Sequence, residues 1–177
     1  MGAVAACCML LTFRAAAADE QRGQLSAHDY KFVVDAAKGG MAEVTLGQLA
    51  AQKATDPSVK DFAQRMVQDH QKANDELTKL AAQKGATLPA DTASAEKSTT
   101  EHLNNLTGAD FDKAYMDHMV KDHKKDVKEF EREAKNAKDP DLQAWATKTL
   151  PILQDHLRMA ESIDTTAKAE KRQSKAQ

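Results

Sequence analysis

Residues 62–74 read Phe-Ala-Gln-Arg-Met-Val-Gln-Asp-His-Gln-Lys-Ala-Asn, and this stretch decides the fold class. At about 100° per residue, the apolar side chains of residues 59–81 fall on one side of a helix, within roughly 60° of a common direction. His70 lies inside that apolar stripe rather than opposite it. The stretch therefore predicts an amphipathic helix that carries a histidine into the protein core.

Three further stretches repeat this arrangement, each with one polar residue on an otherwise apolar helical face. Their apolar residues recur at the spacing of an amphipathic helix. We therefore expect four helices, each carrying one polar group inward. The three further residues and their helical stretches are Glu43 in residues 27–54, His123 in residues 108–137 and His156 in residues 140–163.

Two kinds of connection separate the four stretches. Asp56-Pro57 and Asp139-Pro140 each place an N-cap residue before a proline at the first helical position, where its missing N–H costs nothing. Residues 86–106 form a much longer, mainly polar connection between the second and third stretches. Short turns join antiparallel neighbours, whereas a long link crosses a bundle. The order therefore predicts an all-α, ferritin-like four-helix bundle with one long crossover between helices 2 and 3.

The composition agrees with a single helical domain. The chain has 177 residues, of which 41% are hydrophobic, 29% charged and only 5% aromatic. This length can bury one core, and the scarcity of aromatic and β-branched residues disfavours sheets. The net charge of −2, with both signs interspersed, offers no broad basic face. We therefore expect no nucleic-acid partner.

The amino-terminal segment differs from the rest. Residues 3–13 are apolar and residues 15–18 are alanines, a pattern typical of a secretory signal peptide cleaved near Ala18. The run is shorter than the about 20 residues that span a bilayer. We therefore expect export to the periplasm or cell envelope, with no membrane span in the mature chain. The expected divisions are a signal-peptide-like segment (1–18), a polar lead (19–25), the bundle (26–167) and a charged tail (168–177).

The four inward polar residues should lie at one depth. Glu43 lies about 13 residues before the first Asp-Pro turn and His70 about 14 after it, so both sit roughly 20 Å from that end. The same count places His123 and His156 at similar distances from the second Asp-Pro turn. A carboxylate and three imidazoles in an apolar core must be paired.

One divalent metal ion would satisfy these four groups. Three neutral imidazoles and a carboxylate suit zinc, iron, manganese or copper, so Glu43, His70, His123 and His156 form a candidate mononuclear metal site. The alternative is a metal-free structural or partner-binding bundle in which Glu43 and the histidines form a hydrogen-bonded network. The sequence alone leaves both alternatives open, and it specifies neither a protein partner nor an oligomeric state.

Two neighbouring patterns refine the prediction. Met66 and Met119 each precede an inward histidine by four residues, so their thioethers are candidate soft ligands for copper, although methionine more often fills core gaps. Asp69 immediately precedes His70 and lies about 100° around the helix from it. Two roles are open for Asp69: it pairs with a histidine on another helix, or it lies at the boundary between core and solvent. The boundary position is favoured.

The sequence favours a binding role over an enzymatic one. Di-iron bundles use pairs of Glu-x-x-His motifs, but the residues three before the inward histidines are Val67, Val120 and Leu153. A carboxylate-bridged di-iron oxidase is therefore disfavoured. There is also no Gly-rich phosphate loop, and both cysteines lie in the signal-like segment.

Four linked motifs extend over most of the chain: Phe32-Val-Val-Asp-Ala-Ala with Gly40-Met-Ala-Glu43, residues 62–70, Phe111-Asp-Lys-Ala-Tyr-Met with Asp122-His123, and Leu150-Pro151 with His156. Together they resemble a bacterial family of exported, ferritin-like domains of unknown function, often labelled predicted outer membrane proteins. The resemblance covers roughly residues 27–163. The resemblance implies a ferritin-like bundle and export, but no established enzyme activity.

Overall fold

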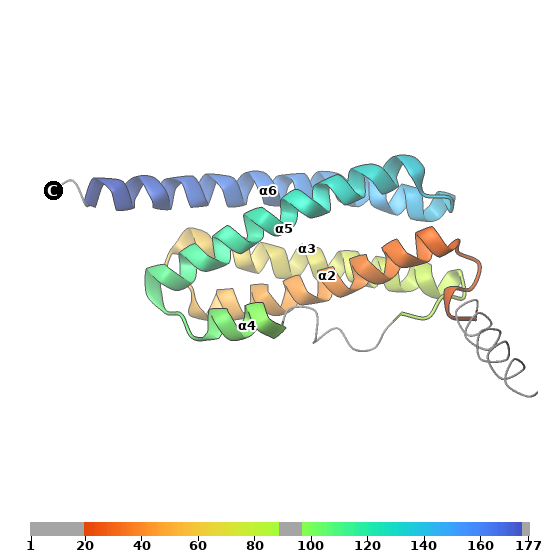
Figure 1. Ribbon diagram of the computed structural model, residues 1–177, viewed down its shortest axis with the longest axis horizontal. Coiled ribbons are helices and arrows are strands. Elements are labelled where there is room, and N and C mark those ends of the chain that lie inside the picture. The colour runs from red at the N-terminus through yellow and green to blue at the C-terminus, as the bar shows by residue number, and fades with distance from the viewer. Residues whose placement is uncertain (1–19, 89–96, 175–177) are drawn as a thin grey trace, which may run out of the picture.

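The computed structural model describes residues 20–88 and 97–174, with side chains through Asp164. All regular secondary structure in these ranges is helical, so the all-α prediction is confirmed. The signal-peptide-like segment 1–18 lies outside the described residues, and α6 continues to Ser174, into the segment expected as a charged tail. The helices are α2 (Ala27–Lys53), α3 (Pro57–Gln83), α4 (Lys97–Asn104), α5 (Gly108–Asn136) and α6 (Pro140–Ser174) (Figure 1).

The four long helices pack as two antiparallel pairs. α2 packs mainly on α3, and α5 mainly on α6, while contacts of α3 with α6 and of α2 with α5 join the pairs. Figure 1 shows that α3 and α5 run in the same direction, with α4 beside the start of α5. The predicted helix order is therefore present, and the ferritin-like assignment stays a prediction. No helix among the described residues combines the length and apolar character needed to cross a membrane.

The predicted helix starts are mostly confirmed. Asp56 accepts a hydrogen bond from the backbone N–H of Ser58 (2.8 Å) at the start of α3. Ser26 accepts one from the backbone N–H of Asp29 (3.1 Å) at the start of α2. Thr107 is the N-cap of α5 but makes no side-chain capping hydrogen bond.

Two buried aspartates tie the helix pairs together at opposite ends of the molecule. Asp112, near the start of α5, accepts hydrogen bonds from the backbone N–H groups of Thr55 (3.0 Å) and Asp56 (2.9 Å) in the α2–α3 turn. Asp29, in the first turn of α2, accepts them from residues 138 and 139 in the α5–α6 turn, both at 3.0 Å. These reciprocal contacts set the relative depth of the two pairs, and with it the register of the inward polar residues.

We expect Asp112→Ala to lower the free energy of unfolding by roughly 2–4 kcal/mol, because two turn N–H groups lose a charged acceptor that is shielded from water. Asp110→Ala is a suitable control, since Asp110 lies in the same turn of α5 and is exposed. Urea unfolding of both variants measures the difference. Equal midpoints for the two variants would contradict this role of Asp112.

The inward polar residues form a layer between two apolar clusters. On α3, Met66 belongs to one cluster and Leu77 to the other, with His70 between them. On α2, α5 and α6, the residues Glu43, His123 and His156 likewise lie between residues of the two clusters. The clusters are centred on aromatic residues, namely Phe62, Phe111 and Tyr115 in the cluster of Met66, and Phe32, Phe130 and Trp145 in the cluster of Leu77.

A glycine allows α2 to approach α3 closely beside this layer. A Cβ atom on Gly47 would lie 2.9 Å from Val67 Cγ2 and 3.1 Å from the Ala63 carbonyl oxygen. A larger residue at position 47 would therefore push the two helices apart. The close approach lets the carboxylate of Glu43 on α2 reach the ring of His70 on α3.

Candidate metal centre

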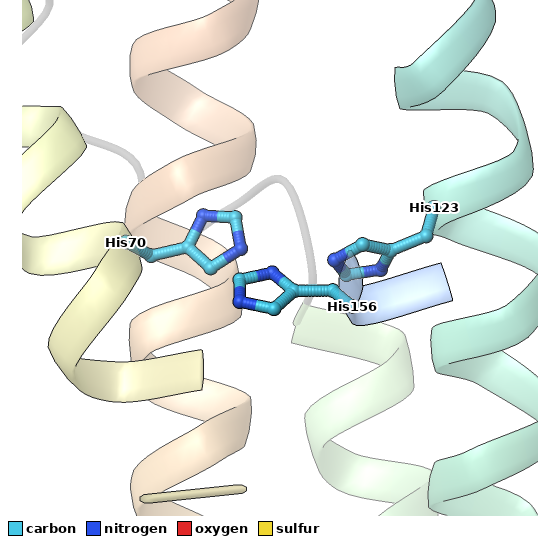
Figure 2. Close-up of side chains that lie close together, drawn as sticks. All are labelled: His70, His123 and His156. Carbon is cyan, nitrogen blue, oxygen red and sulfur yellow. The ribbon is translucent and has the colours of Figure 1, made fainter. Parts of the chain in front are cut away.

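Three buried histidines from three helices converge at mid-bundle. His70 on α3, His123 on α5 and His156 on α6 each place one ring nitrogen within 4.8 Å of the others. Their ring centroids are separated by 5.8 Å (His70 to His123), 5.3 Å (His70 to His156) and 5.4 Å (His123 to His156). Figure 2 shows the three rings extending toward one another. All three residues are at most 5% exposed.

Each ring has one nitrogen beside an acceptor and one nitrogen without a hydrogen-bond partner. The acceptors are carboxylate or carbonyl oxygens, so the ring nitrogen beside each must carry the proton. The remaining nitrogens, Nε2 of His70, Nε2 of His123 and Nδ1 of His156, are buried and unpartnered. The acceptor contacts are His70 Nδ1 to Glu43 Oε2 (3.0 Å), His123 Nδ1 to the Met119 carbonyl oxygen (3.1 Å) and His156 Nε2 to Asp69 Oδ2 (2.9 Å).

The core holds these histidines in their neutral form. Burial lowers the pKa of His123 to about 3, with a further contribution from His156. Burial also lowers the pKa of His70 well below its usual value, and the pKa of His156 is lowered although Asp69 opposes the shift. Neutral imidazole is the form that binds metal ions.

The geometry of the three rings fits a single metal ion. Metal–nitrogen bonds of about 2.0–2.1 Å in a tetrahedral site place the ligand nitrogens roughly 3.4 Å apart. The three ring nitrogens already lie within 4.8 Å of one another, so small side-chain rotations would complete the contact. Metal-binding histidines also characteristically direct their second nitrogen at a carboxylate or carbonyl oxygen, as all three do here.

The structure places Glu43 behind the histidines. Its Oε2 is 3.0 Å from Nδ1 of His70 and its Oε1 is 3.5 Å from Nδ1 of His123. In this position the carboxylate orients two rings. Helical periodicity places Glu43 at the right depth, but only the packed side chains show which nitrogen it faces. Its predicted role as a direct ligand stays a prediction.

Met66 and Met119 lie fully buried in the apolar cluster on one side of the polar layer. Met119 also supplies the backbone carbonyl oxygen that accepts from His123. This carbonyl contact follows from the spacing of four residues within one helix. The role of the two thioethers as soft ligands stays a prediction.

Asp69 has a role that the sequence analysis weighed but did not favour. Its side chain is 29% exposed, yet its Oδ2 contacts both His156 (2.9 Å) and Arg65 (3.3 Å). The sequence feature that pointed to this contact is the position of Asp69 immediately before an inward histidine, one residue around the helix toward α6. Which neighbouring side chain it meets depends on how α3 packs on α6.

We expect Asp69→Ala to weaken metal binding at the three histidines about 10- to 100-fold, because the His156 ring loses the acceptor that fixes its tautomer and orientation. Asp155→Ala is the matched control, since Asp155 also precedes an inward histidine but is 43% exposed and pairs with arginine. Competition titration against a zinc-binding dye measures both. Equal affinities would show that Asp69 does not support the site.

An acidic cleft adjoins the histidines between α2 and α5. Glu43, Asp122 and Asp126 each place one oxygen within 4.8 Å of the others. They line a cleft of about 480 Å³. Burial, together with the nearby Asp122 carboxylate, raises the pKa of Asp126 to about 7, while Lys125 opposes the shift. The cleft places the carboxyl groups of Asp122 and Asp126 beside Glu43, which itself contacts two of the histidines.

Comparisons with known proteins identify the family. A family model described as a domain of unknown function, DUF4142, matches residues 14–163. The chain belongs to the DUF4142 family. A search of curated proteins gives no match for this DUF4142 chain.

Two solved structures resemble this DUF4142 chain in fold. One is a DUF305 fragment from Deinococcus radiodurans, with a TM-score of 0.71 and 11% identity, which covers 80% of this chain and 98% of the fragment. The other is CopM in the Cu(II)-bound form, with a TM-score of 0.64 and 14% identity, covering 78% of this chain and 96% of CopM. At such low identity the likeness establishes a shared fold alone.

Proposed function

We propose that this DUF4142 chain is an exported metal-binding protein, a ferritin-like bundle whose core histidines hold one divalent metal ion. One observation carries the proposal. Three buried neutral imidazoles converge, and each has one nitrogen beside an acceptor and its other nitrogen unpartnered. A network built only for hydrogen bonding would be expected to use those nitrogens, because a buried polar atom without a partner costs about 1–3 kcal/mol.

The ligand chemistry favours copper or zinc over iron and manganese. Imidazole nitrogen suits copper, zinc and iron, but the affinity of such a site is lower for divalent manganese and iron than for copper and zinc, and manganese prefers oxygen ligands. The neutral rings do not balance the positive charge of a metal ion. The carboxylates of Glu43 and Asp69, which contact His70 and His156, supply two negative charges that would balance it. Likeness to the Cu(II)-bound form of CopM supports copper as the first ion to test.

We propose carriage or storage of the ion rather than catalysis. All three histidines are at most 5% exposed, which protects an ion from solvent but leaves a substrate little access. The adjoining acidic cleft would attract cations toward Glu43 and supports uptake of an ion. We also propose export to the periplasm or cell envelope, which the signal-like pattern of residues 1–18 supports. Fractionation of cells that express the full chain tests this location.

A metal-free structural or partner-binding module is the second candidate. The observation that favours it is the contact of Glu43 with both His70 and His123, which satisfies part of the polar layer without an ion. In that case the histidines serve the specificity of helix packing, and the protein acts through its surface.

Metal titration separates the two candidates. We expect the purified protein to bind one tight equivalent of Cu²⁺ or Zn²⁺ by equilibrium dialysis with elemental analysis. His70→Ala with His123→Ala should abolish that equivalent, whereas His102→Ala, which changes an exposed histidine, should keep it. Absence of a tight equivalent in the wild-type protein would reject the metal site and leave the structural module.

A further inference from the structure

We propose a second divalent-cation site, formed by His28, Asp29 and Glu133 at the end of the molecule where α2 begins and α5 ends (Figure 1). One ligand atom from each of the three residues lies within 4.8 Å of the others. Glu133 is ten residues beyond His123 on α5, so this site lies roughly 15 Å along the helix from the core histidines. The two sites therefore share no residue.

The imidazole of His28 lies between two buried carboxylates. Its Nδ1 is 3.3 Å from Asp29 Oδ1, and its Nε2 is 3.5 Å from Glu133 Oε1. The His28 side chain is 48% exposed, whereas those of Asp29 and Glu133 are 1% and 0% exposed. The histidine is thus both a candidate ligand and the side of the cluster that is open to solvent.

The carboxylate of Glu133 is incompletely satisfied. Its Oε1 contacts Nε of Arg132 at 2.8 Å, but its Oε2 is buried without a hydrogen-bond partner. A fully buried carboxylate oxygen without a donor is costly. A cation beside Glu133 would use that oxygen, and it is this atom that points to a ligand rather than to a purely structural cluster.

Asp29 can bind a cation while it keeps its hydrogen bonds to the α5–α6 turn. Its two oxygens already accept hydrogen bonds from the backbone N–H groups of residues 138 and 139. An ionised carboxylate has about four lone-pair positions, so acceptor capacity remains. A cation here would therefore add to the tie between α2 and the α5–α6 turn.

The donor set selects a class of ion that differs from that of the core site. One imidazole and two carboxylates suit a borderline first-row divalent cation such as Zn²⁺ or Mn²⁺, with water completing the coordination on the exposed side. The core site offers three nitrogens and is closed to solvent. We expect the second site to bind Zn²⁺ more weakly than the core site.

Counting zinc equivalents in four forms of the full chain tests this proposal. The forms are the wild-type protein, His28→Ala, the His70→Ala and His123→Ala double variant, and His102→Ala as an exposed-histidine control. We expect His28→Ala to lose one zinc equivalent, or to bind it at least 10-fold more weakly, and His102→Ala to lose none. The double variant should retain the equivalent that depends on His28.

The same counts separate this proposal from the core metal site. If both sites bind, the wild-type protein takes up two equivalents and His28→Ala one. If only the second site binds, the wild-type protein takes up one and His28→Ala none. If His28→Ala matches the wild-type protein in zinc uptake, the second site is rejected, even where the substitution lowers stability. In that case His28 joins the two carboxylates through its own contacts, without a metal. Glu133→Gln, which keeps the side-chain shape, should also weaken this equivalent.

Discussion

Lowering the pH from 7.5 to 4.5 is expected to reduce the free energy of unfolding of the metal-free protein by on the order of 5 kcal/mol. The cause is the three core histidines, whose pKa values burial lowers, that of His123 to about 3. In the unfolded chain each ring binds a proton near pH 6.5, whereas in the folded core it does not.

The sign follows from proton linkage. A histidine with a depressed folded pKa contributes nothing to pH dependence above about pH 6.5, where both states are neutral. Below that value the unfolded state binds more protons, so stability falls as the pH drops toward the folded pKa. Each such proton costs about 1.4 kcal/mol per pH unit. The Asp126 carboxyl acts in the opposite direction, because its folded pKa is raised to about 7, and so offsets part of the loss.

Urea unfolding at a series of pH values, with a chelator present, measures this dependence. The control is a variant in which His70 and His123 are both replaced by leucine, which should have a much shallower slope between pH 4.5 and 6.5. Wild-type and variant proteins with equal slopes would show that the buried rings accept protons without unfolding. That result would argue against a closed core around the histidines.

We expect His123→Leu to raise the stability of the metal-free protein and to abolish its stabilisation by metal. In the metal-free wild-type protein, Nε2 of His123 is buried without a partner, so an apolar residue of similar size removes an unfavourable burial. In the presence of metal the balance reverses. An ion at 1,000 times its dissociation constant stabilises the wild-type fold by about 4.1 kcal/mol, and this gain requires the ligand.

Thermal unfolding of both proteins, with chelator and with Cu²⁺ or Zn²⁺, measures this reversal in their relative stability. Val120→Leu is a suitable control, because Val120 lies on the same helix, is half-buried and packs at the edge of the apolar cluster. If His123→Leu is instead less stable than wild type with chelator at pH 7.5, the imidazole stabilises the fold by itself. The structural module would then be the better description of the polar layer.

Some of the site follows from helix geometry alone. Once the four stretches are helical, a rise of about 1.5 Å per residue places His70 and Glu43 level about one turn. The same count places His123 and His156 level about the other. The Asp-Pro pairs provide fixed starting points for these counts, because an N-cap and a first-turn proline define a helix start locally. The candidate histidines could therefore be chosen before any contact between helices was known.

The partners of the histidines could not be chosen in this way. Asp69 was favoured as a boundary residue because periodicity placed it off the apolar stripe, yet it accepts from His156 on another helix. Glu43 was grouped with the ligands by depth, whereas its oxygens face the outer nitrogens of His70 and His123.

The helices, their order and the inward direction of Glu43, His70, His123 and His156 follow from the sequence, since helix formation and amphipathic spacing are local properties of the chain. Residue spacing does not specify which ring nitrogen meets which acceptor, or that Asp29 and Asp112 each cap the turn of the opposite helix pair. These contacts depend on the rotation and axial shift of one helix against another. Both are set by the packing of many side chains, including the close approach at Gly47.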